Sequence, residues 1–98
     1  MKVHHHSGAE EVNIGDRFIW GTGDSWEIVR LAGSMYSPST IGPSPNFACK
    51  CLDENMPGWL QKYIEEDGTV VFCGDSIASA MSGKYKGRRL SSKSGADQ

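Results

Sequence analysis

Apolar and polar residues alternate along several short stretches of the chain, and this period of two predicts β-strands. The first stretch supports a strand over residues 16–20, and the second supports one over residues 25–31. Residues 21–24 between them read GTGD, a turn sequence, so the two strands are expected to pair as a hairpin. Ile14, Phe18 and Trp20 fall on one face of the first stretch, and Trp26 and Ile28 fall on one face of the second.

The same pattern predicts two further strands. Residues 46–52 read NFACKCL and place Phe47, Cys49 and Cys51 on one face. Residues 69–73 read TVVFC and form the last predicted strand. The large side chains expected in the core are therefore Trp26, Phe47 and Phe72.

Residues 59–66 fit two structures, and we favour a helical turn. A helical period puts the following apolar residues on one face: Met56, Trp59, Leu60, Tyr63 and Ile64. Pro57 suits the first turn of a helix. In the alternative, the Asp-Gly pair at residues 67–68 closes a hairpin in which Tyr63 faces Phe72.

One short helix is expected after the last strand. Residues 76–81 read SIASAM, and Asp75 before them is a residue type that commonly caps a helix. Gly83 is suited to end the helix, because glycine readily takes the left-handed conformation there.

The segment from residue 32 to residue 46 predicts a long loop. It holds three proline, two glycine and four serine residues, which disfavour regular structure. At about fifteen residues it exceeds the usual length of a connection, so it is expected to be functional or disordered and the most mobile part of the body. Exposed side chains in this loop and beside the Pro-Gly turn are candidates for binding a partner: Tyr36, Ile41 and Trp59.

With 98 residues, the chain is expected to hold one domain. Residues 1–8 read MKVHHHSG, typical of a residual expression tag, and are set aside. Residues 9–82 are the expected β-rich domain, and they carry eleven acidic and four basic residues, a balance of −7. Residues 83–98 carry five basic residues and one acidic residue, a balance of +4, and predict a flexible basic tail.

Three cysteines, an odd number, argue against a disulfide framework. Cys49 and Cys51 are spaced as C-x-C, whereas a structural zinc site needs four ligands and commonly uses C-x2-C. We therefore expect reduced thiols, no metal site, no cofactor and a cytoplasmic location. No secretory signal is recognised, and no apolar run reaches the roughly 20 residues that a membrane span needs.

The candidate catalytic residues are few. The only histidines are at residues 4–6, inside the segment interpreted as a tag, so no Ser-His or Cys-His nucleophile pair is expected. A carboxylate pair such as Glu65 with Asp67 is more simply read as a solvated charged turn. The glycines of residues 21–23 lack the Gly-Lys-Ser/Thr that a phosphate loop needs. The chain is therefore expected not to be an enzyme.

Together these patterns predict a β-rich fold, mainly β to α+β, with four or five short antiparallel strands and one or two short helices. The strand led by Gly15-Asp16, the Gly/Asp hairpin, the long loop and the two further strands resemble an SH3-like small barrel. Over residues 14–81 the chain is also similar to short β domains common among phage and integron-cassette products. The resemblance implies a small barrel or a meander and an origin in a mobile element, and it implies no functional residue.

Two functions remain open. The first is a small protein-binding or adaptor domain that uses the long loop and the exposed aromatic residues. The second is association with nucleic acid, either through the basic tail or by an acidic body that inhibits a nucleic-acid-binding partner. Tail-driven DNA binding should be weak at physiological salt, since few phosphate contacts are available. A protein partner is favoured, no membrane is expected, and self-association stays open.

Overall fold

The structure is a computed structural model, and it describes residues 1–36, 43–54 and 56–91. In chain order its elements are β1 (Lys2–His5), β2 (Gly8–Glu11), β3 (Arg17–Ile19), β4 (Ser25–Tyr36), β5 (Pro43–Cys51), the 3-10 helix η1 (Gly58–Tyr63), β6 (Val70–Cys73), α1 (Gly74–Met81), the 3-10 helix η2 (Lys84–Lys86) and β7 (Arg88–Ser91).

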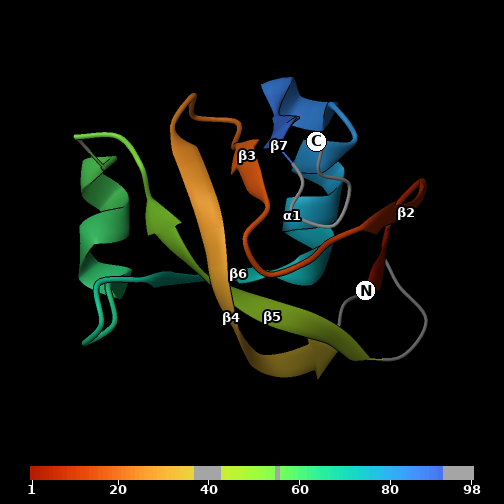
Figure 1. The fold of residues 1–98 in the computed structure, drawn as a ribbon, viewed down its shortest axis with the longest axis horizontal. Coiled ribbons are helices and arrows are strands. Elements are labelled where there is room, and N and C mark those ends of the chain that lie inside the picture. Colours follow the sequence, from red (N-terminus) through yellow and green to blue (C-terminus); the bar gives the residue numbers. More distant parts are fainter. Residues whose placement is uncertain (37–42, 55, 92–98) are drawn as a thin grey trace.

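Five strands form one antiparallel sheet in the order β6-β5-β4-β3-β7, and β1 and β2 form a separate hairpin. The chain runs through β3, β4, β5 and β6 as a meander, and β7 then returns to pair with β3. Strands β6 and β7 are the two edges of this sheet in the described part of the chain. The expected β-rich fold is confirmed, and the sheet has the form of a meander (Figure 1).

The first hairpin is confirmed at residue level. Phe18 on β3 lies opposite Trp26 on β4, and both side chains are fully buried. The indole Nε1–H of Trp26 donates to Oδ2 of the buried Asp24 at 2.5 Å, which satisfies the one polar group of the ring. Ile14 does not share this burial, because it lies before the strand and is 47% exposed.

The predicted long loop is largely strand. β4 continues to Tyr36 and β5 begins at Pro43, and they pair in this region, for example Tyr36 with Pro43. The register shifts between Leu31 and Ser34, where Gly33 has a φ of +83°, a conformation that costs glycine little. Prolines are tolerated because this end of β5 extends beyond β6 and has fewer ladder bonds to lose. Residues 37–42 of the predicted loop lie outside the described residues.

Phe72 lies at the centre of the aromatic core. Its ring centroid is 4.8 Å from that of Trp26, 5.0 Å from that of Trp20 and 6.2 Å from that of Phe18. The predicted core residues Trp26, Phe47 and Phe72 are all buried, which confirms the inward faces of their strands. The other buried members of the core are Val3, Val12, Phe18, Ile28, Cys49, Leu60, Val70, Ile77, Ala78, Ala80 and Met81.

The helical interpretation of the ambiguous segment is confirmed in part, since η1 covers Gly58–Tyr63. Of this helix only Leu60 is buried, so it is attached to the core by one side chain. Phe72 lies opposite Phe47 in the sheet, and the alternative pairing with Tyr63 is not formed. The Asp-Gly pair still makes a turn, in which Gly68 N–H donates to the carbonyl of Glu65 at 2.9 Å.

Helix α1 begins earlier than predicted. Cys73 is its N-cap, without a side-chain cap bond, and Asp75 lies in the first turn, where a carboxylate favours the helix dipole. Gly83 follows the helix with a φ of +96°, as expected for the residue that ends it. The helix packs against the β1–β2 hairpin and against both edges of the sheet. No helix in the described part of the chain is long and apolar enough to cross a membrane.

The first eight residues are part of the fold, which corrects their exclusion from it. β1 pairs with β2 from Lys2 opposite Glu11 to His5 opposite Gly8. Val3 is 1% exposed and belongs to the core, and the hairpin packs on α1. The amino-terminal boundary of the domain therefore lies before residue 9.

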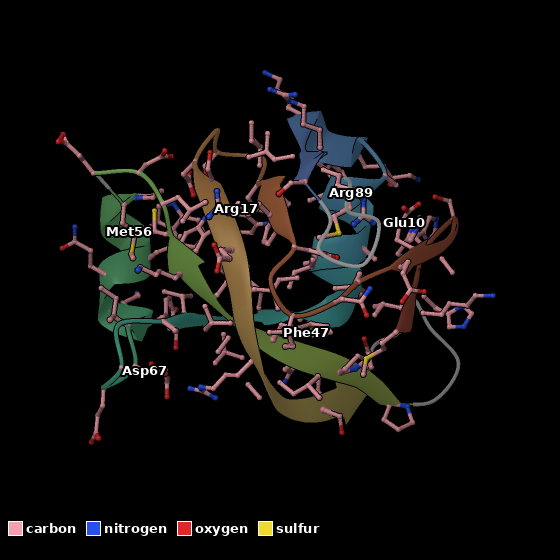
Figure 2. The ribbon with its side chains drawn as sticks, viewed as in Figure 1. Glu10, Arg17, Phe47, Met56, Asp67 and Arg89 are labelled. Atoms are coloured by element: carbon pink, nitrogen blue, oxygen red, sulfur yellow. The ribbon has the colours of Figure 1, made fainter. Side chains whose placement is uncertain are left out.

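The expectation of a flexible tail after residue 82 was wrong for residues 84–91. β7 pairs with β3, and the Arg89 guanidinium lies toward the β1–β2 hairpin (Figure 2). Its Nη1 lies 3.3 Å from Oδ2 of Asp16, which is fully buried, and its Nη2 donates to the carbonyl of Glu11 at 2.6 Å. Deleting residues 83–98 would remove a strand and leave this carboxylate without its cation. Residues 92–98 lie outside the described part.

Phe72→Ala is expected to lower the free energy of unfolding by about 3–5 kcal/mol, because it empties the centre of a packed aromatic cluster. Urea denaturation followed by circular dichroism measures the loss. Val71→Ala is the matched control: this neighbour is 36% exposed, and its truncation should cost less than about 1 kcal/mol. Equal losses for the two variants would show that Phe72 does not occupy the core.

Candidate functional site

Two hollows adjoin on one side of the molecule. The first, of about 470 Å³, lies between the β3–β4 turn, α1 and η2. The second, of about 370 Å³, lies between η1 and β6. Trp20 and Ser76 line both, so the two hollows are neighbours, and we call them together the aromatic trough. Its aromatic lining residues are Trp20, Trp59, Tyr63, Phe72 and Tyr85.

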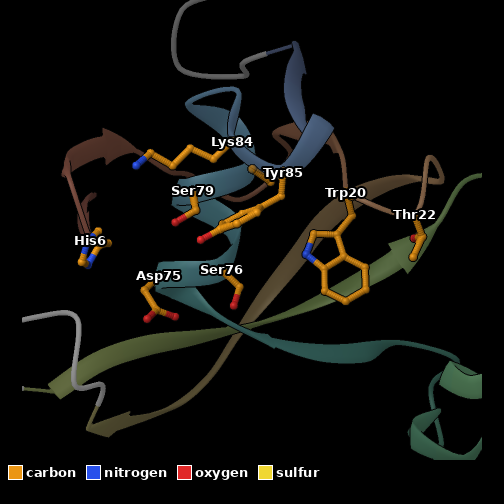
Figure 3. Close-up of a pocket in the computed structure, with 10 residues that line it drawn as sticks. His6, Trp20, Thr22, Asp75, Ser76, Ser79, Lys84 and Tyr85 are labelled. Carbon is orange, nitrogen blue, oxygen red and sulfur yellow. The ribbon is translucent and has the colours of Figure 1, made fainter.

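The first hollow combines aromatic faces with polar groups. Trp20 and Tyr85 lie beside the face of α1 that carries Ser76 and Ser79 (Figure 3). The charged and remaining polar side chains of its lining are His6, Thr22, Asp75 and Lys84. An apolar surface with a few converging donors and acceptors is the usual composition of a binding site.

Tyr85 is held in an uncommon backbone conformation. Its φ is +53° and that of Lys86 is +67°, values that few residues other than glycine adopt. The side chain is nevertheless 82% exposed, so burial of the ring does not offset this strain. Backbone strain of this kind concentrates at functional sites. The strained conformation presents the Tyr85 ring at the first hollow.

Gly21 makes the placement of Tyr85 feasible. A Cβ built on Gly21 would lie 2.8 Å from the carbonyl oxygen of Tyr85, closer than real Cβ contacts allow. Residue 21 therefore has to be glycine for η2 to approach the β3–β4 turn this closely. The sequence GTGD forms a hairpin turn as predicted, and its first glycine also accommodates an element more than 60 positions away.

Trp20 connects the trough to the core. It follows β3, and its backbone is fixed by the turn, since its carbonyl accepts from Gly23 N–H at 2.8 Å. Its ring stacks on Phe72 at 5.0 Å and 24°. The Trp20 ring also lies near that of Trp59, at 5.6 Å between centroids. Trp20, which lines both hollows, is therefore packed against the core residue Phe72.

The second hollow is more apolar than the first. Trp59 is 52% exposed and Tyr63 is 54% exposed, although both are large aromatic residues that commonly lose exposure on folding. Leu60, which lies between them in η1, is buried and attaches the helix to the sheet. Glu65 is the one charged residue among those that line this hollow.

The predicted partner-binding residues have different outcomes. Trp59 lines the trough, as an exposed aromatic residue. Tyr36 lies at the end of β4, opposite Pro43, and Ile41 lies outside the described residues. Trp20 and Tyr85 were not among the predicted partner-binding residues. Trp20 was expected in the core, and Tyr85 was expected in a flexible tail. The one local signal for Tyr85 was its position between two lysines.

His6 lies at the first hollow, although its segment resembles an expression tag. It lines the hollow together with Asp75, Ser76 and Ser79. Within the part of the chain that the structure describes, no hydrogen bond joins His6 to either serine.

The three cysteines are free. Burial raises the pKa of the Cys49 thiol, and burial, with lesser effects of the Asp24 and Asp53 carboxylates, raises that of Cys51. Burial also raises the pKa of Cys73, with a further contribution from the charge and hydrogen bond of Asp75. Protonated thiols are poor nucleophiles and poor metal ligands. In the described residues no three His, Cys, Asp or Glu side chains are grouped to hold a metal ion.

Comparisons with known proteins give no relative for this fold and site. No family model matches the chain, and no curated protein or solved structure matches it.

Gly21→Ala is expected to cost about 1–3 kcal/mol of unfolding free energy, because the added methyl group forces η2 away from the turn. Gly58→Ala is the matched control, since a Cβ there has no atom within 4 Å and leaves η2 untouched. The control should be neutral or slightly stabilising, by up to about 1 kcal/mol. Urea denaturation compares the two. If both variants unfold like the wild type, Tyr85 does not approach Gly21 as described.

Proposed function

We propose that this protein is a non-enzymatic binding domain that takes an extended segment of a partner protein into the aromatic trough. The observation that carries the proposal is the exposure of Trp59, Tyr63 and Tyr85, at 52%, 54% and 82%, along the walls of two adjoining hollows. Tryptophan and tyrosine are the residues that most often dominate the binding energy of protein interfaces.

The form of the trough favours an extended polypeptide. Its two hollows follow each other and share Trp20 and Ser76, so neighbouring side chains of one segment can enter both. The hydroxyls of Thr22, Ser76 and Ser79 along the first hollow supply donors and acceptors for a peptide backbone. An interface with an aromatic centre and a polar rim is typical of protein recognition.

The structure gives less support to binding of nucleic acid by the basic carboxyl-terminal segment. Arg89, one of its five basic residues, is engaged with Asp16, Glu10 and the carbonyl of Glu11. Lys84 lines the trough. Lys86 and Arg88 are exposed, and Lys93 lies outside the described residues. Two or three phosphate contacts give only weak, salt-sensitive binding.

A reducing, cytoplasmic environment fits the proposal. The three thiols are unpaired, and the raised pKa values of Cys49, Cys51 and Cys73 describe packed, unreactive side chains. An accessory protein encoded by a mobile element would work in this compartment, where it meets the proteins of its host.

The test is a selection of random peptides displayed on phage against the folded protein. The affinities of selected peptides are then measured by calorimetry for the wild type, Trp59→Ala and Tyr85→Ala. Each substitution should weaken binding about five- to thirtyfold, since truncation of a central interface aromatic costs about 1–2 kcal/mol.

Leu31→Ala is the matched control, because Leu31 is 50% exposed on β4 and does not line the trough. It should leave the affinities unchanged. Peptides that bind Trp59→Ala and Tyr85→Ala as tightly as the wild type would contradict the proposal, and so would a selection that yields no peptide.

A further inference from the structure

We infer that the second hollow of the trough is a pocket for a long basic side chain, arginine or lysine, of the bound segment. The inference rests on the proposed function and specifies which chemistry its partner carries. It follows from the charge of the hollow, from its aromatic walls and from their arrangement.

The charge of the hollow is negative. Glu65 is the one charged side chain among its lining residues. Asp67 is held by Arg30, with Nε 3.1 Å from Oδ2. Among the described residues, neither Glu65 nor Glu66 has an ion-pair partner. A cation on the ligand therefore meets a carboxylate that has no ion-pair partner within the described part of the chain.

The walls of the hollow attract a cation independently of Glu65. The faces of Trp20, Trp59 and Tyr63 carry partial negative charge, and tryptophan is the strongest partner in cation–π contacts. Tyr63 already makes one such contact within the chain, since Nζ of Lys62 lies 5.4 Å from its ring centroid. Lys62 does not line the hollow, so it does not fill the space that a ligand would enter.

The lining of the hollow suits both the methylene chain of an arginine or lysine and its charged group. Leu60, Val70 and Phe72 form buried apolar lining, while Glu65 is exposed. Arginine and lysine place a methylene chain on apolar surface and keep the charged group toward solvent. Arginine should bind better than lysine, because its planar guanidinium also stacks on aromatic rings.

The test uses two small probes, N-acetyl-arginine amide and N-acetyl-citrulline amide, which have the same shape and differ in charge. Titration is followed by NMR on the indole N–H signals of the ¹⁵N-labelled protein. The arginine probe should move the signals of Trp20 and Trp59. The signal of Trp26 is an internal control, because this ring is buried and bonded to Asp24. The citrulline probe should bind at least fivefold more weakly.

Glu65→Gln should weaken the arginine probe about two- to fivefold, the range of an exposed ion pair. Glu66→Gln is the matched control and should leave binding unchanged, because Glu66 does not line the hollow. Equal binding of both probes, equal effects of both substitutions, or no movement of the Trp20 and Trp59 signals would each overturn the inference. None of these results contradicts the proposed function, which the peptide selection tests separately.

Discussion

The fold is built around the buried carboxylate of Asp16 and its contact with Arg89. Asp16 is fully inaccessible to solvent, and an isolated carboxylate in that position would be strongly unfavourable. The groups that compensate it include the N–H of Asn13, which donates to Oδ2 at 2.9 Å, and Arg89, which supplies a positive charge. Because Arg89 belongs to β7, its contribution to this compensation forms only when β7 has docked against β3.

This requirement positions the functional surface. Once β7 is paired with β3, the segment between α1 and β7 has little freedom, and η2 lies against the β3–β4 turn. Tyr85 is thereby held at the trough in its strained conformation. Trp20 precedes Gly21 in the chain, and its ring stacks on the core residue Phe72. The exposed aromatic residues of the proposed site are thus presented by a rigid framework, which limits the entropy lost on binding.

The sequence predicts those parts of the fold whose signals are local. Alternation identifies the strands around Trp26, Phe47 and Phe72, and the GTGD turn identifies the hairpin that joins the strand of Trp26 to the strand before it. The pairing of β7 leaves no such signal, because Arg89 and Asp16 are 73 positions apart and a run of basic residues resembles a solvated tail.

The composition of the two termini and of the proline-rich segment was misleading because residues distant in the sequence order these segments. A histidine run reads as a tag, yet neighbouring Val3 completes the core under α1. Proline and serine predict a loop, yet the strands extend through much of the segment, because one side of β5 is unpaired there. Trp59 was found because it adjoins a Pro-Gly turn. Tyr85 becomes a candidate only when tertiary contacts fix its segment.

A double-mutant cycle, followed by urea denaturation, measures the coupling between Asp16 and Arg89 most directly. Arg89→Met should cost about 3 kcal/mol in the wild-type background, since it leaves a buried carboxylate uncompensated. In the Asp16→Asn background, where that charge is absent, the same substitution should cost at least about 2 kcal/mol less. Arg88→Met, at the exposed neighbouring position, should cost less than about 0.5 kcal/mol in either background. Costs of Arg89→Met that are equal in the two backgrounds would contradict the claim that this ion pair holds the carboxyl-terminal strand in the fold.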